Sequence, residues 1–354
     1  MKQDGIHSAQ KIFTGTNWLY DFSVVVKNGF IVDLIPTNQL NEKPNQEYHT
    51  LIPAFIDLQI YGASNRLFSV YPDTETLQKL YKYCISGKTA FYLPTIATNT
   101  YQVMYDCIDA VKTYWQQGGK GCLGLHIEGP WIHSSKRGAH VESLIHSPKK
   151  EEVLQLLEYG KGVIKMITLA PEVCDSAIIH LIKSYGIVIS AGHSNATYEQ
   201  AINSFNNGIT TVTHLYNAMS GLQHREPGMV GAAFNHREVM ASIIPDGYHV
   251  DFAAIKIAKK MMDNRLFVIT DAVTQNTQGH YQHTLMGDKY ESNFILSGSA
   301  LTMEKAVNNL VNYCGIEIEE AFRMYSLYPA MILGLDQQLG KIEKGFQAAF
   351  TYWE

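Results

Sequence analysis

The feature that most constrains the fold of this chain is a repeated alternation of short apolar runs with longer segments of helical periodicity, which begins near Pro53. Such runs are typical of buried strands, and the helical segments between them force successive strands to lie parallel. About eight units of this kind close naturally into a barrel. The expected strands are residues 55–60, 89–93, 122–127, 163–169, 187–191, 210–213, 239–244 and 266–270.

Helical patterns lie between these runs, and some follow a residue that can cap a helix N-terminus. Two helices are expected at residues 74–85 behind Asp73 and at residues 198–206 behind Thr197. Further helices are expected at residues 101–115, 172–185, 303–313 and 318–325.

The two chain ends have a different, β-rich character. Short β patterns at residues 23–26 and 30–34 are separated by a Lys-Asn-Gly turn, and residues 339–353 form a glycine-punctuated β-like tail. Neither end alone could bury an apolar face, so we expect the tail to pair with the N-terminal strands. This predicts a small β domain from residues 1–50 and 330–354, and a barrel domain from residues 51–329.

Composition excludes several classes of protein. With 46% hydrophobic and 17% charged residues, the 354-residue chain is expected to be globular. Its net charge of -5 provides no basic field for a nucleic acid, and no apolar run is long enough to span a membrane. The five scattered cysteines favour buried free thiols, and we expect a cytoplasmic protein without an export signal.

Polar residues follow several expected strands at the point where each strand ends. Glu128, His193, His214 and Asp271 stand at or just beyond four strand ends, and His249 follows another. In a parallel α/β barrel these positions converge on one mouth, where the chemistry takes place. We therefore expect these five groups to face one cavity.

One carboxylate and two imidazoles suit a borderline divalent ion such as Zn²⁺. An open coordination position would make the site catalytic, and Asp271 is the candidate for proton transfer. A single histidine at a strand end is more often a structural group, so the argument depends on the whole set. His126, two residues before Glu128, either supports the metal ligands from behind or only packs in the core. The remaining histidines are expected to be ordinary surface or hydrogen-bonding groups: His7, His49, His146, His180, His236, His280 and His283.

Six ordered motifs resemble one enzyme family, and they extend from about residue 50 towards the C-terminus. They are PAFIDLQIYG from Pro53, HIEGPW from His126, AGHS from Ala191, THLYNAM from Thr213, REPG from Arg225 and ITDA from Ile269. The set is similar to the N-acetylglucosamine-6-phosphate deacetylase family of the amidohydrolase superfamily. The resemblance implies a distorted (β/α)8 TIM barrel with a small β-sandwich domain built from both chain ends. It also implies hydrolysis of N-acetylglucosamine 6-phosphate to glucosamine 6-phosphate and acetate in amino-sugar metabolism.

The resemblance assigns roles residue by residue. Glu128, His193 and His214 match the family's metal ligands, and Asp271 matches its general acid/base.

Other matched positions concern the substrate. His140 aligns with the histidine that helps polarise the substrate carbonyl. His249 and Arg225 match phosphate contacts, with the arginine expected from the partner of a homodimer, and Asn217 and Ala218 match sugar and phosphate contacts.

The chain departs from the superfamily at the end of the first barrel strand. Members with two metals carry His-x-His there, whereas this chain has Gln59 and Tyr61. An amide and a phenol are poor ligands beside imidazoles, so we expect one catalytic ion, most simply Zn²⁺. Gln59 is assigned to substrate binding, with retention of a water in the vacant place as the alternative.

Two other functions stay open on the sequence. One is a different cyclic-amide hydrolysis or deamination on the same scaffold. The other is a barrel that has lost catalysis and serves as a binding protein, which the missing His-x-His suggests.

Overall fold

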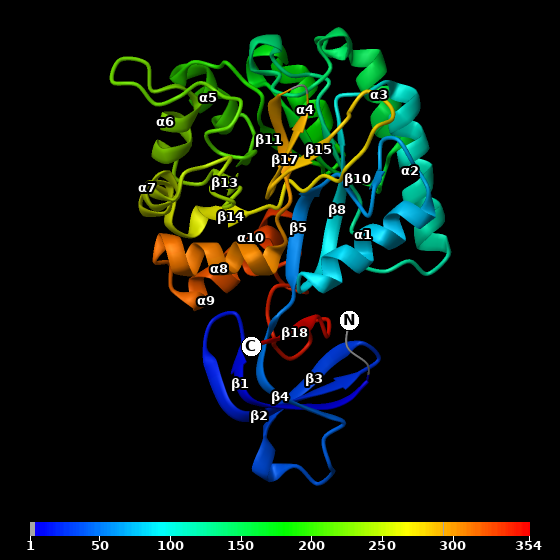
Figure 1. Cartoon of the computed structure of the whole chain (residues 1–354), viewed down its shortest axis with the longest axis vertical. Coiled ribbons are helices and arrows are strands. Elements are labelled where there is room, and N and C mark those ends of the chain that lie inside the picture. Colours follow the sequence, from blue (N-terminus) through cyan, green and yellow to red (C-terminus); the bar gives the residue numbers. More distant parts are fainter. Residues whose placement is uncertain (1–3, 293) are drawn as a thin grey trace.

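The computed structural model describes residues 4–292 and 294–354, and it contains a parallel barrel with a small β sheet at one end (Figure 1). Eight strands form one sheet in the order β14-β13-β12-β11-β10-β9-β8-β5. Each barrel strand therefore lies next to the barrel strand that precedes it in the chain. This confirms the expected barrel. The strands are β5 (Phe55–Ile60), β8 (Thr89–Ala97), β9 (Leu125–Glu128), β10 (Ile164–Leu169), β11 (Val188–Ala191), β12 (Thr211–Val212), β13 (Met240–Ile243) and β14 (Leu266–Val268).

Helices follow most of these strands, and capping side chains mark the starts of several of them. The Asp73 carboxylate accepts the Thr76 N–H at 2.8 Å, which confirms the predicted cap. Thr197, the other predicted cap, forms a capping box with Gln200. The helices are α1 (Thr74–Ser86), α2 (Tyr101–Gln116), α3 (Lys150–Tyr159), α4 (Ser176–Ser184), α5 (Tyr198–Asn206), α6 (Gly228–Asn235), α7 (Phe252–Met262), α8 (Met303–Cys314), α9 (Ile318–Tyr325) and α10 (Leu327–Ile332).

The predicted start of one helix is wrong. The sequence predicts a helix from residue 172, but α4 begins at Ser176. Asp175 caps α4 by accepting the Ile178 N–H at 2.8 Å, and a separate 3-10 turn covers Pro171–Val173. A cap residue has extended backbone angles, so it divides what periodicity alone joins into one helix.

The chain ends form the small sheet. Its five strands lie in the order β18-β4-β1-β2-β3, with bounds β1 (Gly5–Phe13), β2 (Trp18–Lys27), β3 (Phe30–Pro36), β4 (Gln46–Pro53) and β18 (Phe350–Trp353). Strand β18 pairs antiparallel with β4, which confirms that the tail joins the N-terminal strands. Most of the expected β-like tail is nevertheless irregular, because Gly345 turns the chain with a φ of 89° and only residues from Phe350 are a strand.

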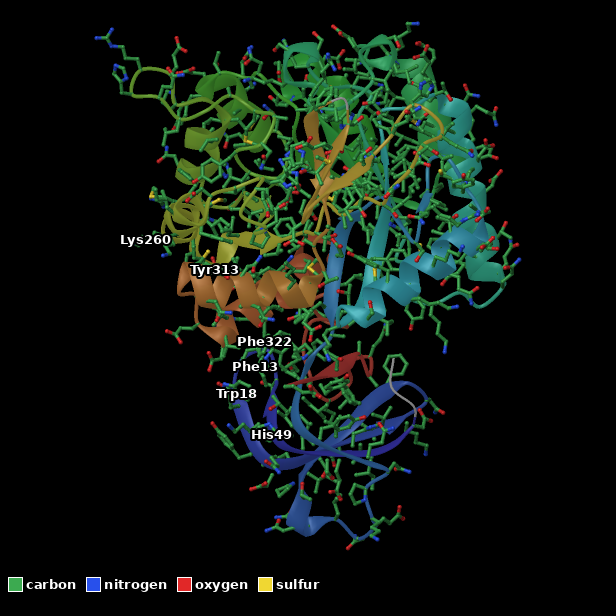
Figure 2. All side chains as sticks on the ribbon, viewed as in Figure 1. Phe13, Trp18, His49, Lys260, Tyr313 and Phe322 are labelled. Carbon is green, nitrogen blue, oxygen red and sulfur yellow. The ribbon has the colours of Figure 1, made fainter. Side chains whose placement is uncertain are left out.

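Aromatic side chains connect the small sheet to the barrel (Figure 2). The ring of Phe13 lies 5.3 Å from that of Trp18 and 5.7 Å from that of Phe322 on α9. The Trp18 indole N–H donates to Glu319 Oε1 at 2.8 Å. Buried aromatic contacts of this kind fix the two parts against each other.

A three-stranded antiparallel sheet, absent from the sequence expectations, is inserted between β14 and α8. It consists of β15 (Thr284–Met286), β16 (Lys289–Ser292) and β17 (Ile295–Ser299). A short hairpin of β6 (Gly62–Ala63) and β7 (Arg66–Leu67) follows β5. The barrel strands run away from the small sheet, so these insertions follow strand ends on the opposite side of the barrel (Figure 1).

The barrel closes between the end of its first strand, β5, and the residues that follow its last strand, β14. Asp271 N–H donates to Gln59 O at 3.0 Å, and Tyr61 N–H donates to Ala272 O at 2.9 Å. Beneath these bonds the buried Asp57 carboxylate accepts the Thr270 hydroxyl and, at 3.2 Å each, the N–H groups of Gln59 and Thr270. The seam of the barrel therefore holds residues 59 and 271 side by side.

No helix within the described residues has both the length and the apolar character to cross a membrane. All five cysteines are buried and free, as expected.

Asp57→Ala should lower the free energy of unfolding by about 2–4 kcal/mol, because three buried donors at the seam lose their acceptor. Thermal and urea unfolding measure the change. Asp288→Ala removes an exposed carboxylate that pairs with Lys305 and serves as the control. Equal stability of the two variants would contradict the role of Asp57 in closing the barrel.

Candidate metal and substrate site

Residues that follow four barrel strands converge on one cavity of about 190 Å³. Glu128 ends β9, while His193, His214 and Asp271 lie just beyond β11, β12 and β14. The last three have left-handed backbones, with φ of 48°, 35° and 53°. Such angles are uncommon outside glycine and are held here by neighbouring segments, since the His214 N–H donates to Ser242 Oγ at 2.8 Å.

Three side-chain atoms form a nearly equilateral triangle. Glu128 Oε1 lies 3.3 Å from His193 Nε2 and 3.2 Å from His214 Nε2, and the two nitrogens lie 3.1 Å apart. Ligand atoms held tetrahedrally at about 2.0–2.1 Å from Zn²⁺ lie about 3.3 Å from one another. The triangle therefore has the size of one face of a tetrahedral metal site. His140, Glu128 and His193 form a second, overlapping group with ligand atoms within 4.8 Å.

Hydrogen bonds distinguish the two histidines of that second group. His193 Nδ1 lies 2.8 Å from Lys136 O and must donate to it, which leaves the lone pair of Nε2 free for an ion. His140 Nδ1 accepts the Thr98 N–H at 3.3 Å, so its proton is on Nε2, 3.2 Å from Glu128 Oε2. His193 is thus suited to bind a metal, and His140 to donate a hydrogen bond.

The charges of the cluster follow from burial and contacts. Burial opposes ionisation of Glu128, but His193, His140 and His214 hold the pKa of this carboxyl well below its usual range. Burial and the neighbouring His193 lower the pKa of His140 to about 4, so its ring is neutral. Burial lowers the pKa of His214, but its hydrogen bond to Glu128 outweighs this effect and the pKa is raised. The site therefore combines a carboxylate with imidazole nitrogens, which is the donor set that Zn²⁺ prefers.

Gln59 and Tyr61 connect the two carboxylates. The Gln59 amide nitrogen lies 2.8 Å from Asp271 Oδ1, 3.1 Å from Glu128 Oε1 and 2.7 Å from the Tyr61 hydroxyl oxygen. Tyr61 in turn donates to Glu128 Oε2. Gln59 is 1% exposed and is not among the residues that line the cavity, whereas Tyr61 is. Burial, together with the charge of Glu128, raises the pKa of Asp271.

The expected substrate contacts are divided between two places. His249, Asn217 and Ala218 line the same cavity as the triangle. The His249 ring donates from Nδ1 to Asp246 at 2.6 Å, which leaves Nε2 available to a ligand. Arg225 is exposed and lines a separate hollow on the loop before α6, so the structure does not bring it to the cavity of its own chain.

His126 lies inside the barrel, below the cavity. Its Nδ1 lies 3.0 Å from Leu58 O and its Nε2 lies 2.8 Å from Thr168 Oγ1, and burial lowers its pKa to about 4. Both nitrogens are thereby occupied by the barrel interior. His126 is a buried hydrogen-bonding group of the strands and offers no atom to a metal.

The structure brings to the cavity one histidine that the sequence did not assign to the site. His283, expected to be an ordinary surface or hydrogen-bonding group, is 4% exposed and lines the cavity together with Tyr281 and Ser297. These residues belong to the segment around β15–β17, in which no strand was expected. Their positions follow no strand or helix periodicity, so only the fold places them at the site.

Comparisons with known proteins identify the family of this chain. Residues 50–354 match the model of the amidohydrolase family, and residues 9–47 match the NagA composite domain. N-acetylglucosamine-6-phosphate deacetylase of Haemophilus influenzae is 32% identical over 94% of this chain and 91% of its own length. N-acetylgalactosamine-6-phosphate deacetylase of Escherichia coli O157:H7 is 31% identical over 96% of this chain and 93% of its own.

A solved structure leads to the same family. The crystal structure of N-acetylglucosamine-6-phosphate deacetylase from Pasteurella multocida superposes with a TM-score of 0.93 at 32% identity, covering 98% of this chain and 95% of that one. The family model covers most of the chain, and the curated relatives exceed 30% identity over nearly its whole length. The chain therefore belongs to the amidohydrolase family.

Proposed function

We propose that this protein hydrolyses the acetamide of N-acetylglucosamine 6-phosphate to glucosamine 6-phosphate and acetate. The observation that carries the proposal is the triangle of Glu128, His193 and His214, which lies in one cavity with Asp271. The names of the relatives and the six motifs of the sequence support the same substrate. Amide hydrolysis needs a polarised carbonyl, an activated water and a proton for the leaving amine.

Glu128, His193 and His214 are the proposed ligands of one divalent ion per subunit, with Zn²⁺ the ion that best suits them. When bound, the ion would acidify a water and polarise the substrate carbonyl. Gln59 and Tyr61 stand where two-metal relatives of the superfamily have two histidines. Their hydrogen bonds to Glu128 favour a single ion, because they fill this place with groups that bind metals poorly.

Asp271 is assigned to the proton transfers, and His140 to stabilisation of the carbonyl oxygen. Asp271 accepts a proton from the attacking water and later delivers it to the amine, which would otherwise be a very poor leaving group. The raised pKa of Asp271 suits a group that must both take and return a proton. His140, whose proton is on Nε2, donates a hydrogen bond to the carbonyl oxygen as negative charge develops there.

The phosphate is assigned to His249 Nε2, with Asn217 and Ala218 as further contacts. Arg225 would complete this contact from the partner in a homodimer, since in its own chain it lies away from the cavity. A guanidinium forms the planar paired bonds that a phosphate accepts. We place this enzyme in the cytoplasm, where its five free thiols would stay reduced.

N-acetylgalactosamine 6-phosphate is the second candidate substrate, because a deacetylase of that name is as similar to the chain as those for the glucosamine epimer. Deamination or cyclic-amide hydrolysis has less support, since the relatives cited above are all deacetylases. A barrel without catalysis would have no reason to keep a triangle of metal-ligand size beside a buried acid.

The purified protein should contain about one zinc ion per subunit, because the triangle provides one set of ligands. His193→Ala and His214→Ala should each lose the ion, and His180→Ala, which changes an exposed histidine on α4, should keep it. Elemental analysis after exhaustive dialysis measures the content. Two ions per subunit, or unchanged content in both site variants, would contradict the assignment.

The wild type should release acetate from N-acetylglucosamine 6-phosphate, and Asp271→Asn should lower kcat by about 10³-fold with its metal retained. The amide keeps the shape of the side chain but cannot carry the proton. Acetate is measured by a coupled assay on samples of known metal content. A variant with substantial kcat would reject the role of Asp271, and an inactive wild type with metal bound would reject the proposed function.

A mixing experiment tests which subunit of the dimer supplies Arg225 to each site. Arg225→Ala and Asp271→Asn subunits, each inactive alone, are unfolded together and refolded. If the arginine acts across the dimer, each mixed dimer has one complete site, and about a quarter of wild-type activity should return. If it acts within its own chain, no subunit has both groups and the mixture should stay inactive.

A further inference from the structure

The proposed chemistry leaves one polar part of the cavity wall without a role. The wall is formed by the segment that enters and leaves the β15–β17 sheet, and His283 and Ser297 of this segment line the cavity. The segment returns to the barrel seam, where Ser299 N–H donates to Asp271 O at 3.0 Å. The wall is thus connected to the residue assigned to proton transfer.

His283 is held firmly and has one nitrogen to spare. Its Nδ1 lies 2.9 Å from Ser297 Oγ, and its backbone N–H and C=O both pair with Asn276, at 2.9 and 3.1 Å. The side chain is almost fully buried, at 4% exposure, yet Nε2 has no hydrogen-bond partner among the described residues. Because His283 lines the cavity, a ligand bound there can supply the partner of this nitrogen.

Tyr281 fixes this wall to the centre of the site. Its ring stacks on His283 at 6.4 Å and 12° and meets His140 edge-on at 6.3 Å and 82°. Its hydroxyl donates to Thr98 O at 2.6 Å, and Thr98 is also the residue whose N–H holds His140. His283 therefore has a fixed position relative to His140, as a recognition group needs.

The chemistry of the wall indicates which group it could recognise. Burial lowers the pKa of His283 to about 4, so near neutral pH the ring carries no charge. A neutral imidazole beside a hydroxyl offers one donor and one acceptor but no charge for a phosphate. A hydroxyl group, which both donates and accepts, is its natural complement.

We propose that His283, oriented by Ser297, hydrogen-bonds a hydroxyl of the substrate's sugar ring and is a specificity-determining residue. This inference rests on the proposed function, and it adds a contact that the metal, the proton transfers and the phosphate do not require. The sugar ring must lie between the acetamide and the phosphate, and both of their assigned contacts line this same cavity.

The test compares His283→Phe with the wild type. Phenylalanine keeps an aromatic ring against Tyr281 but removes both nitrogens, so KM for N-acetylglucosamine 6-phosphate should rise about tenfold while kcat changes less than about threefold. His283→Gln should recover part of the loss, because its amide nitrogen can reach near the position of Nε2. His280→Phe is the matched control, since His280 is exposed three residues earlier in the same segment.

Both sugar epimers are assayed, and unfolding temperatures confirm that the variants fold. A larger effect on one epimer would identify the hydroxyl at which they differ, and equal effects would assign a hydroxyl that they share. KM values within twofold of wild type for both substrates would overturn the role of His283. Calorimetry measures the Kd of N-acetylglucosamine 6-phosphate for Asp271→Asn and for the double variant Asp271→Asn/His283→Phe. This binding measurement separates the role of His283 from failure of the proposed function. A tenfold difference in Kd supports the contact even without turnover, and equal Kd values reject it.

Discussion

The structure depends on one buried negative charge, the carboxylate of Glu128 at the end of β9. Burying an unpaired carboxylate is very costly, so the barrel must surround it with donors. Gln59, Tyr61 and His140 donate hydrogen bonds to it, and the Nε2 atoms of His193 and His214 lie within 3.3 Å of Oε1. Without these donors the barrel would be destabilised, and a divalent ion would neutralise the charge further. Stability of the barrel mouth and affinity for a metal therefore have the same physical origin.

The seam of the barrel determines how the two carboxylates are placed. The end of β5 is bonded to the residues that follow β14, and these bonds set Gln59 beside Asp271. The Gln59 amide then lies between Asp271 and Glu128, within hydrogen-bond distance of both. A donor between two acids offsets part of the repulsion by which Glu128 raises the pKa of Asp271. An amide at this position thus fits a site with one ion and one free acid.

Much of the fold could be predicted from the sequence, and the errors have identifiable causes. Alternation located all eight barrel strands, and capping residues located the starts of α1 and α5. The start of α4 was wrong because Asp175 interrupts a continuous periodic pattern. The β15–β17 sheet was missed because its residues are largely exposed and carry no buried face that periodicity could detect. As a result His283, which belongs to the cavity wall, was placed among the ordinary histidines.

The sequence by itself determined the barrel and the set of groups at its mouth, because strand alternation and strand-end positions are local properties of the chain. It also identified Gln59 and Tyr61 as a departure from a two-metal site. The tertiary structure alone decided which nitrogen of each histidine is free, since His193 and His140 are fixed by Lys136 and Thr98, far from them in sequence. It also placed Arg225 away from the metal-site cavity of its own chain. Such contacts depend on how distant segments pack, and no local pattern encodes them.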